Sequence, residues 1–154
     1  MSDGSISDYF TGVAAKRLAA VDAEPESSNQ HEVTGSSPLR KILGDVDRKL
    51  ASNNGYKTTF IWVAQENESV LETGFVSWYD SRRQNKRRSE WRLYYQGNAV
   101  TKLMQAGDFL FLARQPNGEL LFVIVPRDSE LAAGMFWLFN LEKPVEEKFV
   151  ARRP

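Results

Sequence analysis

Apolar residues change their spacing partway along the chain, from a helical repeat to alternation. Between 38 and 51 they recur every three or four residues, at Leu39, Ile42, Leu43, Val46 and Leu50. This spacing predicts an amphipathic helix over 38–51. Ser37 followed by Pro38 is a typical helix start, and the run Asn53-Asn54-Gly55 favours a turn after its end.

Beyond residue 55, β-branched and aromatic residues dominate, which is typical of strands. We expect strands over 56–64, 70–79, 91–95, 109–114 and 120–125. The last two flank Asn117-Gly118, which favours a tight hairpin. Because both faces of these two strands are apolar, we expect them at the centre of the core.

The other segments are less regular. Residues 9–22 combine alanines, which favour helix, with a strand-like start. Residues 23–37 are predicted to form a long polar loop, and 98–105 and 128–138 two further helices. Strands and helices do not alternate regularly. The pattern therefore predicts a mainly β (α+β) distorted barrel with flanking helices, rather than a doubly wound sheet.

The length of 154 residues predicts one domain, with flexible termini at 1–8 and about 143–154. No apolar run approaches the ~20 residues that a membrane-spanning helix needs, so we expect no membrane association. The start, MSDGSISD, has neither the charge nor the hydrophobicity of a signal peptide. These features predict a cytoplasmic protein.

Cysteine is absent, and His31 is the one histidine. Disulfides, thiolate nucleophiles and cysteine-ligated metal sites are therefore excluded. A serine triad could be built only around His31. Most of the common hydrolytic chemistries are therefore excluded for this chain.

The net charge is zero, with 20 lysines and arginines against 20 aspartates and glutamates, but it is unevenly distributed. Between Arg82 and Arg92 there are six cations and one anion, Glu90, which is a net +5, so the rest of the chain carries −5. Such asymmetry focuses positive potential on one segment, which lies between two predicted strands. A solvated basic loop is the alternative interpretation.

The basic segment contains each side-chain type that reads base edges. Arginine and lysine recognise guanine, asparagine and glutamine recognise adenine, and a carboxylate accepts from the cytosine amino group. Glu90 is informative because a carboxylate weakens plain attraction to phosphate. It suits a cytosine reader or a clamp for neighbouring arginines, and a salt bridge within the loop is the alternative.

Two stretches resemble the N-terminal domain family of the EcoRII restriction endonuclease. Tyr79-Asp80-Ser81 followed by Lys86-Arg87-Arg88-Ser89-Glu90-Trp91-Arg92 is similar to the recognition arm of that family, Tyr-Asn-Ser and then Lys-x-Arg-x-Glu-Lys-Arg. His31-Glu32-Val33 is similar to the His-Gln-Val of its first arm. Motif-level similarity is confined to residues 9–35 and 79–97. Trp91 stands where the family has lysine, and Ser36 where it has tyrosine.

The resemblance implies a B3-like DNA-binding pseudobarrel that reads double-stranded 5′-CCWGG-3′ through two arms, 24–37 and 81–92, in the major groove. It implies an effector or target-recognition domain of a bacterial type II restriction endonuclease, monomeric in isolation. Such a domain would have no catalytic residues and no cofactor, and Mg²⁺ would be needed only by a separate catalytic domain. Lys86, Arg88, Glu90 and Arg92 would read bases or adjacent phosphates. The full set of expected DNA contacts is His31, Glu32, Ser36, Arg82, Arg83, Gln84, Asn85, Lys86, Arg87, Arg88, Glu90, Trp91 and Arg92.

Two other functions fit parts of the sequence. A self-contained Mg²⁺-dependent nuclease would use an acidic-x-lysine triplet, for which Asp47-Arg48-Lys49 and Glu146-Glu147-Lys148 are the candidates. A protein-interaction domain would use an aromatic surface made by Trp62, Trp78, Phe136 and Trp137. We expect these four aromatic residues to lie in the core instead.

Overall fold

Strands are the main regular elements of the computed structural model, which describes residues 10–23, 32–34, 37–44, 55–63, 69–80, 91–95, 97–139, 141 and 150–152. The strands are β1 (Gly12–Arg17), β2 (Glu32–Thr34), β3 (Tyr56–Trp62), β4 (Val70–Asp80), β5 (Trp91–Tyr95), β6 (Phe109–Arg114), β7 (Leu120–Val125) and β8 (Val150–Arg152). The helices are α1 (Ala20–Ala23), α3 (Ser37–Leu43) and α4 (Leu131–Leu138). None of these helices is long and apolar enough to cross a membrane.

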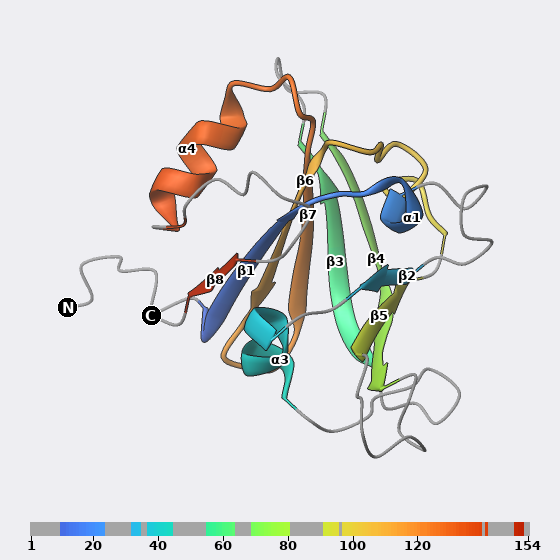
Figure 1. Cartoon of the computed structure of the whole chain (residues 1–154). Helices are drawn as coiled ribbons and strands as arrows, with labels where there is room; N and C mark the ends of the chain where they lie inside the picture. Colours follow the sequence, from blue (N-terminus) through green and yellow to red (C-terminus); the bar gives the residue numbers. More distant parts are fainter. Residues whose placement is uncertain are drawn as a thin grey trace.

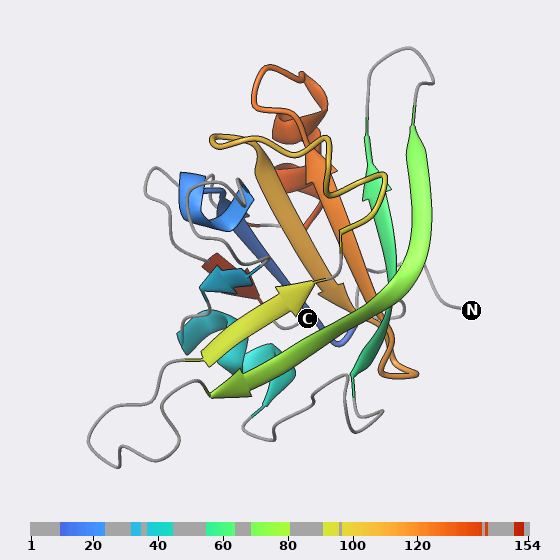
Figure 2. The same ribbon diagram turned by 90° about the vertical axis from the view of Figure 1, so that its right-hand side faces the viewer.

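In this described part of the chain, eight strands form one sheet in the order β2-β5-β4-β3-β7-β6-β1-β8. All neighbours are antiparallel except β3 and β7, which are parallel. The sheet curls on itself, and β4 is the most strongly curved strand (Figures 1 and 2). The expected mainly β open barrel with flanking helices is confirmed.

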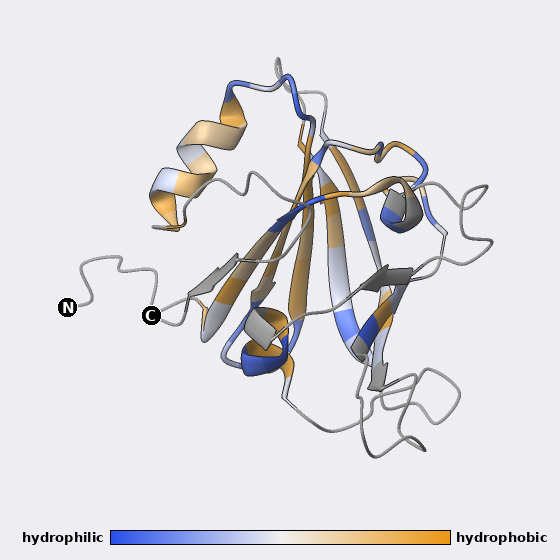
Figure 3. Ribbon diagram, in the orientation of Figure 1, coloured by the Kyte–Doolittle hydropathy of each residue, from blue (hydrophilic) through white to orange (hydrophobic). Residues whose placement is uncertain are grey.

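Alternating side chains of the central strands β6 and β7 pack into two hydrophobic cores, one on each face of the sheet. Leu110 and Phe122 point into the barrel, where the rings of Phe60 and Phe122 lie 4.9 Å apart. Phe111 and Val123 point to the other face, which α4 covers through Phe136. Figure 3 shows the apolar colour along β6, β7 and α4. Strands β6 and β7 are therefore central, as predicted from their apolar faces.

The helix α3 ends earlier than its hydrophobic repeat predicts. Gly44 follows Leu43 with φ +87°, a left-handed conformation that glycine adopts without strain. Its amide donates to the carbonyl of Arg40 at 2.7 Å, which completes the helix terminus. The predicted helix over 38–51 is thus wrong at Gly44, and residues 45–51 of the prediction lie outside the described part of the chain.

Three other predictions need correction. The predicted loop 23–37 contains the strand β2 and the start of α3. Residues 98–105 form successive turns rather than a helix, although the side chain of Asn98 accepts from the amides of Val100 and Thr101 as a cap would. The terminus expected to be flexible contains β8, which pairs with β1. The ambiguous segment 9–22 contains β1 and most of α1.

Candidate nucleic-acid interface

The basic segment connects two paired strands. β4 and β5 are antiparallel, and their register pairs Trp78 with Leu93, Tyr79 with Arg92, and Asp80 with Trp91. Residues 81–90 therefore connect Asp80 to Trp91, its partner on the neighbouring strand. The prediction that this segment lies between two strands of a hairpin is confirmed, while residues 81–90 themselves lie outside the described part of the chain.

The end of this hairpin extends beyond the neighbouring strand β3. Residues 70–76 of β4 pair with β3 on one side, and residues 76–80 pair with β5 on the other side. Val76 is the residue that pairs with both strands, through Tyr56 and Tyr95. The last four residues of β4, 77–80, lie past the beginning of β3 (Figure 2). Trp78 is nevertheless fully buried, because it packs in the barrel core that includes residues of α3.

The strand β2 brings the first predicted arm to the same hairpin. It pairs with β5 on the side opposite β4, with Thr34 facing Arg92 and Glu32 facing Tyr94. Tyr79, Arg92 and Thr34 thus occupy one row across three strands. Since β2 is antiparallel to β5, the chain leaves Thr34 at the end of the sheet where the basic segment leaves Asp80.

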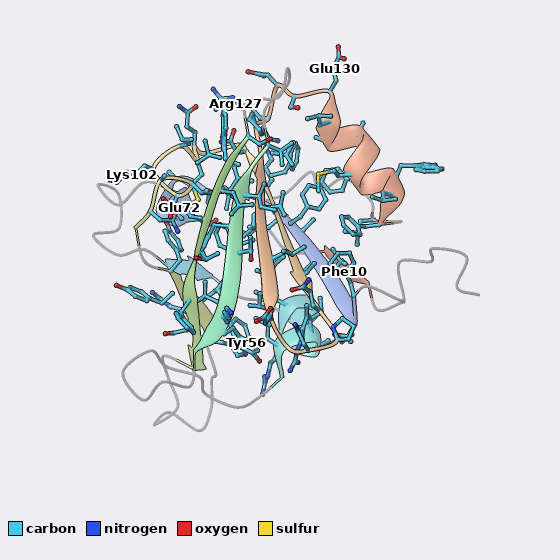
Figure 4. The ribbon with its side chains drawn as sticks, turned by 180° about the vertical axis from the view of Figure 1, so that it is seen from behind. Phe10, Tyr56, Glu72, Lys102, Arg127 and Glu130 are labelled. Carbon is cyan, nitrogen blue, oxygen red and sulfur yellow. The ribbon has the colours of Figure 1, made fainter. Side chains whose placement is uncertain are left out.

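The carbonyls at the end of α3 are held by side chains from three strands. The carbonyl of Ile42 accepts from Arg114 Nη1 at 2.9 Å, and that of Leu43 accepts from the Tyr56 hydroxyl at 2.8 Å. The Gly44 carbonyl accepts from Trp78 Nε1 at 2.9 Å. Terminal helix carbonyls lack intrahelical donors, so these bonds satisfy them. They fix α3 at one end of the barrel, near Tyr56 in Figure 4.

A second anchor holds the short helix that precedes the first arm. Lys16 Nζ lies 2.8 Å from Asp22 Oδ2, and both side chains are almost completely buried. The same carboxylate oxygen accepts from the Ala19 amide at 2.8 Å. The Tyr95 hydroxyl donates to the Asp22 carbonyl at 2.7 Å. Burial raises the pKa of the Tyr95 phenol above its usual range, and the Asp22 carboxylate raises it further.

Sequence reasoning assigned no role to Asp22, Trp78 or Tyr95 in this site. A general signal existed for the two aromatic residues, because a buried indole or phenol needs a polar partner for its N–H or O–H. Nothing in the local pattern identified those partners, which lie 34 and 73 positions away along the chain.

Most of the predicted contact residues lie outside the described part of the chain. Glu32 and Trp91 are placed by their backbones, in β2 and at the start of β5. The Arg92 side chain is half-buried, on the face of β5 opposite the buried Leu93. The residues outside the described ranges are His31, Ser36, Arg82, Arg83, Gln84, Asn85, Lys86, Arg87, Arg88 and Glu90.

The structure describes the aromatic residues of the protein-interaction alternative but not the acidic-x-lysine triplets of the nuclease alternative. Both acidic-x-lysine triplets lie outside the described ranges, and the described residues contain no group of three potential metal ligands. Among the aromatic residues, Trp78 and Phe136 are buried, and Trp62 is partly buried against the core, as expected. Trp137 is 83% exposed, so its predicted core position is wrong. It lies on α4, whose face away from the sheet meets solvent.

The fold of this chain is similar to that of a solved structure, while neither a family model nor a curated protein sequence matches the chain. The chain is similar to the B3 domain of the UbaLAI restriction endonuclease, crystallised with cognate DNA, at 15% sequence identity and a TM-score of 0.42. The similarity covers 92% of this chain and 86% of that domain's chain.

Proposed function

We propose that this chain is a sequence-specific double-stranded DNA-binding domain. The segments 24–37 and 81–92 contact the major groove, and phosphate contacts set the register of the protein on the duplex. The proposed target is 5′-CCWGG-3′. This target comes from the resemblance of the two segments to the arms of the EcoRII N-terminal domain family.

The observation that carries the proposal is the pairing of β2, β5 and β4. Thr34 faces Arg92, which faces Tyr79, so the first segment passes through β2 directly beside the hairpin that carries the second segment, and the chain leaves Thr34 at the Asp80–Trp91 end. Two base-reading elements must reach one short DNA site together, and this register supports that arrangement. The segments are distant in sequence, so their common origin on the sheet is not a consequence of chain continuity.

The chemistry of the second segment supports the same function. Its net charge of +5 attracts phosphate, while the remaining chain carries −5 and repels it. Rigid paired strands on both sides fix where the segment begins and ends. The chain can therefore approach DNA productively in one orientation.

The parent protein is proposed to be a type II restriction endonuclease whose cleavage domain lies outside this chain. This domain acts as the effector or target-recognition module, as a monomer and without a cofactor of its own. Mg²⁺ is required only by the separate catalytic domain. Cutting of DNA by this chain with Mg²⁺, lost in Glu146→Ala and Lys148→Ala, would favour the nuclease alternative instead.

Binding titrations in Mg²⁺-free buffer at fixed salt test the proposal. The probes are a duplex containing 5′-CCAGG-3′ and duplexes with each base pair of that site substituted in turn. We expect each substitution of an outer G·C pair to weaken binding by about 1–3 kcal/mol. Equal binding of all duplexes would contradict the proposed target, and no binding of any duplex would contradict DNA recognition.

One observation favours a protein-interaction surface as a second candidate. Trp137 and Leu138 are exposed at the end of α4, and Leu131 is partly exposed at its start. A helix with so few polar side chains usually packs on more than one side. If α4 binds a partner chain, binding will be insensitive to salt and will be lost in Trp137→Ser, while DNA binding is unchanged.

A further inference from the structure

Two hydrogen bonds connect the β4–β5 hairpin to the two sides of the first segment. Tyr95 of β5 donates to the Asp22 carbonyl at 2.7 Å, directly before residues 24–31. Trp78 of β4 donates to the Gly44 carbonyl at 2.9 Å, at the end of the helix that follows residue 36. The same hairpin carries the basic residues of the second segment.

Both donors occupy the core face of the hairpin. Trp78 pairs with Leu93, and Tyr95 pairs with Val76, and all four side chains belong to the barrel core. The acceptors are the backbone carbonyl of Asp22 in α1 and that of Gly44, which directly follows α3, and both places are themselves fixed. Lys16 holds the Asp22 carboxylate, and Arg114 and Tyr56 hold the carbonyls that precede Gly44. The bonds therefore join rigid parts of the molecule.

We propose that Trp78 and Tyr95 are positioning residues that fix the two DNA-contacting segments relative to each other. The inference rests on the proposed function, which it extends by naming what sets the geometry of readout. Each side chain is fully buried or nearly so, so neither touches DNA. They act through the backbone on both sides of residues 24–36.

Loss of such a link should affect specific and non-specific binding differently. Base readout depends on hydrogen-bond geometry, which tolerates only small displacements. Attraction of a basic segment to phosphate is long-ranged and independent of sequence. A looser link should therefore reduce discrimination between duplexes and leave the affinity for unrelated DNA nearly unchanged.

Tyr95→Phe is the sharpest variant, because it removes one hydroxyl and keeps the ring in the core. Trp78→Phe is the second variant, and it removes the indole N–H that reaches Gly44. Thr101→Val is the matched control. Thr101 is also buried, and its hydroxyl oxygen accepts from the Asn98 amide at 2.8 Å in a turn that follows β5 and holds neither segment.

The experiment measures Mg²⁺-free affinities for two fluorescein-labelled duplexes, the sequence that the wild-type chain enriches from a random pool and a shuffled version of it. We expect Tyr95→Phe and Trp78→Phe to lower the ratio of the two affinities by about tenfold, the discrimination that one base contact provides. Affinity for the shuffled duplex should stay within about twofold, and an unchanged near-UV circular dichroism spectrum shows that the variants are folded. Thr101→Val should keep the wild-type ratio.

The outcomes separate the two proposals. If the wild-type chain enriches no sequence, the proposed function fails and this inference fails with it. If the wild-type chain discriminates and both variants keep its ratio, the positioning role alone is overturned. An equal loss of affinity for both duplexes, matched by Thr101→Val, would assign the two residues to general stability and would also overturn that role.

Discussion

Lys16 and Asp22 form an ion pair of 2.8 Å between β1 and α1 with almost no exposure to solvent. Removing one partner of such a pair leaves a buried charge without compensation. We expect Lys16→Met to lower the free energy of unfolding by about 3–5 kcal/mol, measured by urea denaturation.

The double variant Lys16→Met/Asp22→Asn is the control for this pair. Asparagine removes the negative charge and keeps an oxygen for the Ala19 amide. The double variant should therefore be more stable than Lys16→Met. If it is less stable, the ion pair does not account for the loss.

The hydroxyl of Tyr95 predicts a specific dependence of stability on pH. Because burial raises the pKa of this phenol, the native state keeps its proton at a pH where the unfolded chain, with a pKa near 10, loses it. The unfolded state then binds fewer protons, so the free energy of unfolding falls as pH rises above about 10.

Tyr95→Phe removes this contribution. We expect the variant to be less stable than wild type at pH 8 and the difference to narrow between pH 10 and 11, by at most about 1.4 kcal/mol per pH unit. Denaturation at several pH values measures it. A constant difference across this range would show that Tyr95 ionises equally in both states.

Replacement of glycine by alanine should change the stability in opposite directions at Gly44 and Gly134. At Gly44 and Gly134 an added Cβ would meet nothing within 4 Å, so space does not distinguish them. Gly44 has φ +87°, where Gly44→Ala should cost about 1–2 kcal/mol. Gly134 lies within α4, where Gly134→Ala should stabilise by about 0.5–1 kcal/mol. Thermal denaturation of both variants checks this, and a stabilising Gly44→Ala would contradict the structure of the α3 terminus.

Glu90 is predicted to read a cytosine. Glu90→Ala should cost about 1–3 kcal/mol of discrimination at that base pair and little at the others. Affinities on duplexes with single substitutions measure it, with Glu130→Ala as the control, since Glu130 is an exposed carboxylate at the start of α4. A uniform loss on all duplexes would assign Glu90 to the structure of the loop.

Arg83 is predicted to contact phosphate. Arg83→Ala should weaken binding to all duplexes about equally and reduce the slope of log K against log salt by about one unit. Arg127→Ala is the control, because Arg127 lies at the end of the sheet opposite Tyr56 (Figure 4). An unchanged slope in Arg83→Ala would remove it from the phosphate contacts.

The elements that sequence predicted well are those whose signal is local. Alternating β-branched and aromatic residues located β3, β4 and β5 to within two residues. Asn117-Gly118 identified the β6–β7 hairpin, where Gly118 has φ +88°. The placement of the basic segment between strands followed directly from these elements.

The elements that sequence missed are defined by distant partners or by one residue. β2 has three residues within a polar stretch and exists because it pairs with β5, which no local pattern reveals. β8 similarly depends on β1. The apolar repeat that predicted a helix over 38–51 continues past Gly44, whose left-handed backbone ends α3. The hydrogen bonds of Trp78 and Tyr95 are equally non-local.

The most direct test of DNA recognition is selection of binding sites by the purified chain from random duplexes, at fixed salt and without Mg²⁺. A domain that reads DNA through two segments carried by the adjacent strands β2, β5 and β4 should enrich a single short sequence with G·C pairs at both ends. Recovery of a pool with the composition of the starting pool would contradict the account.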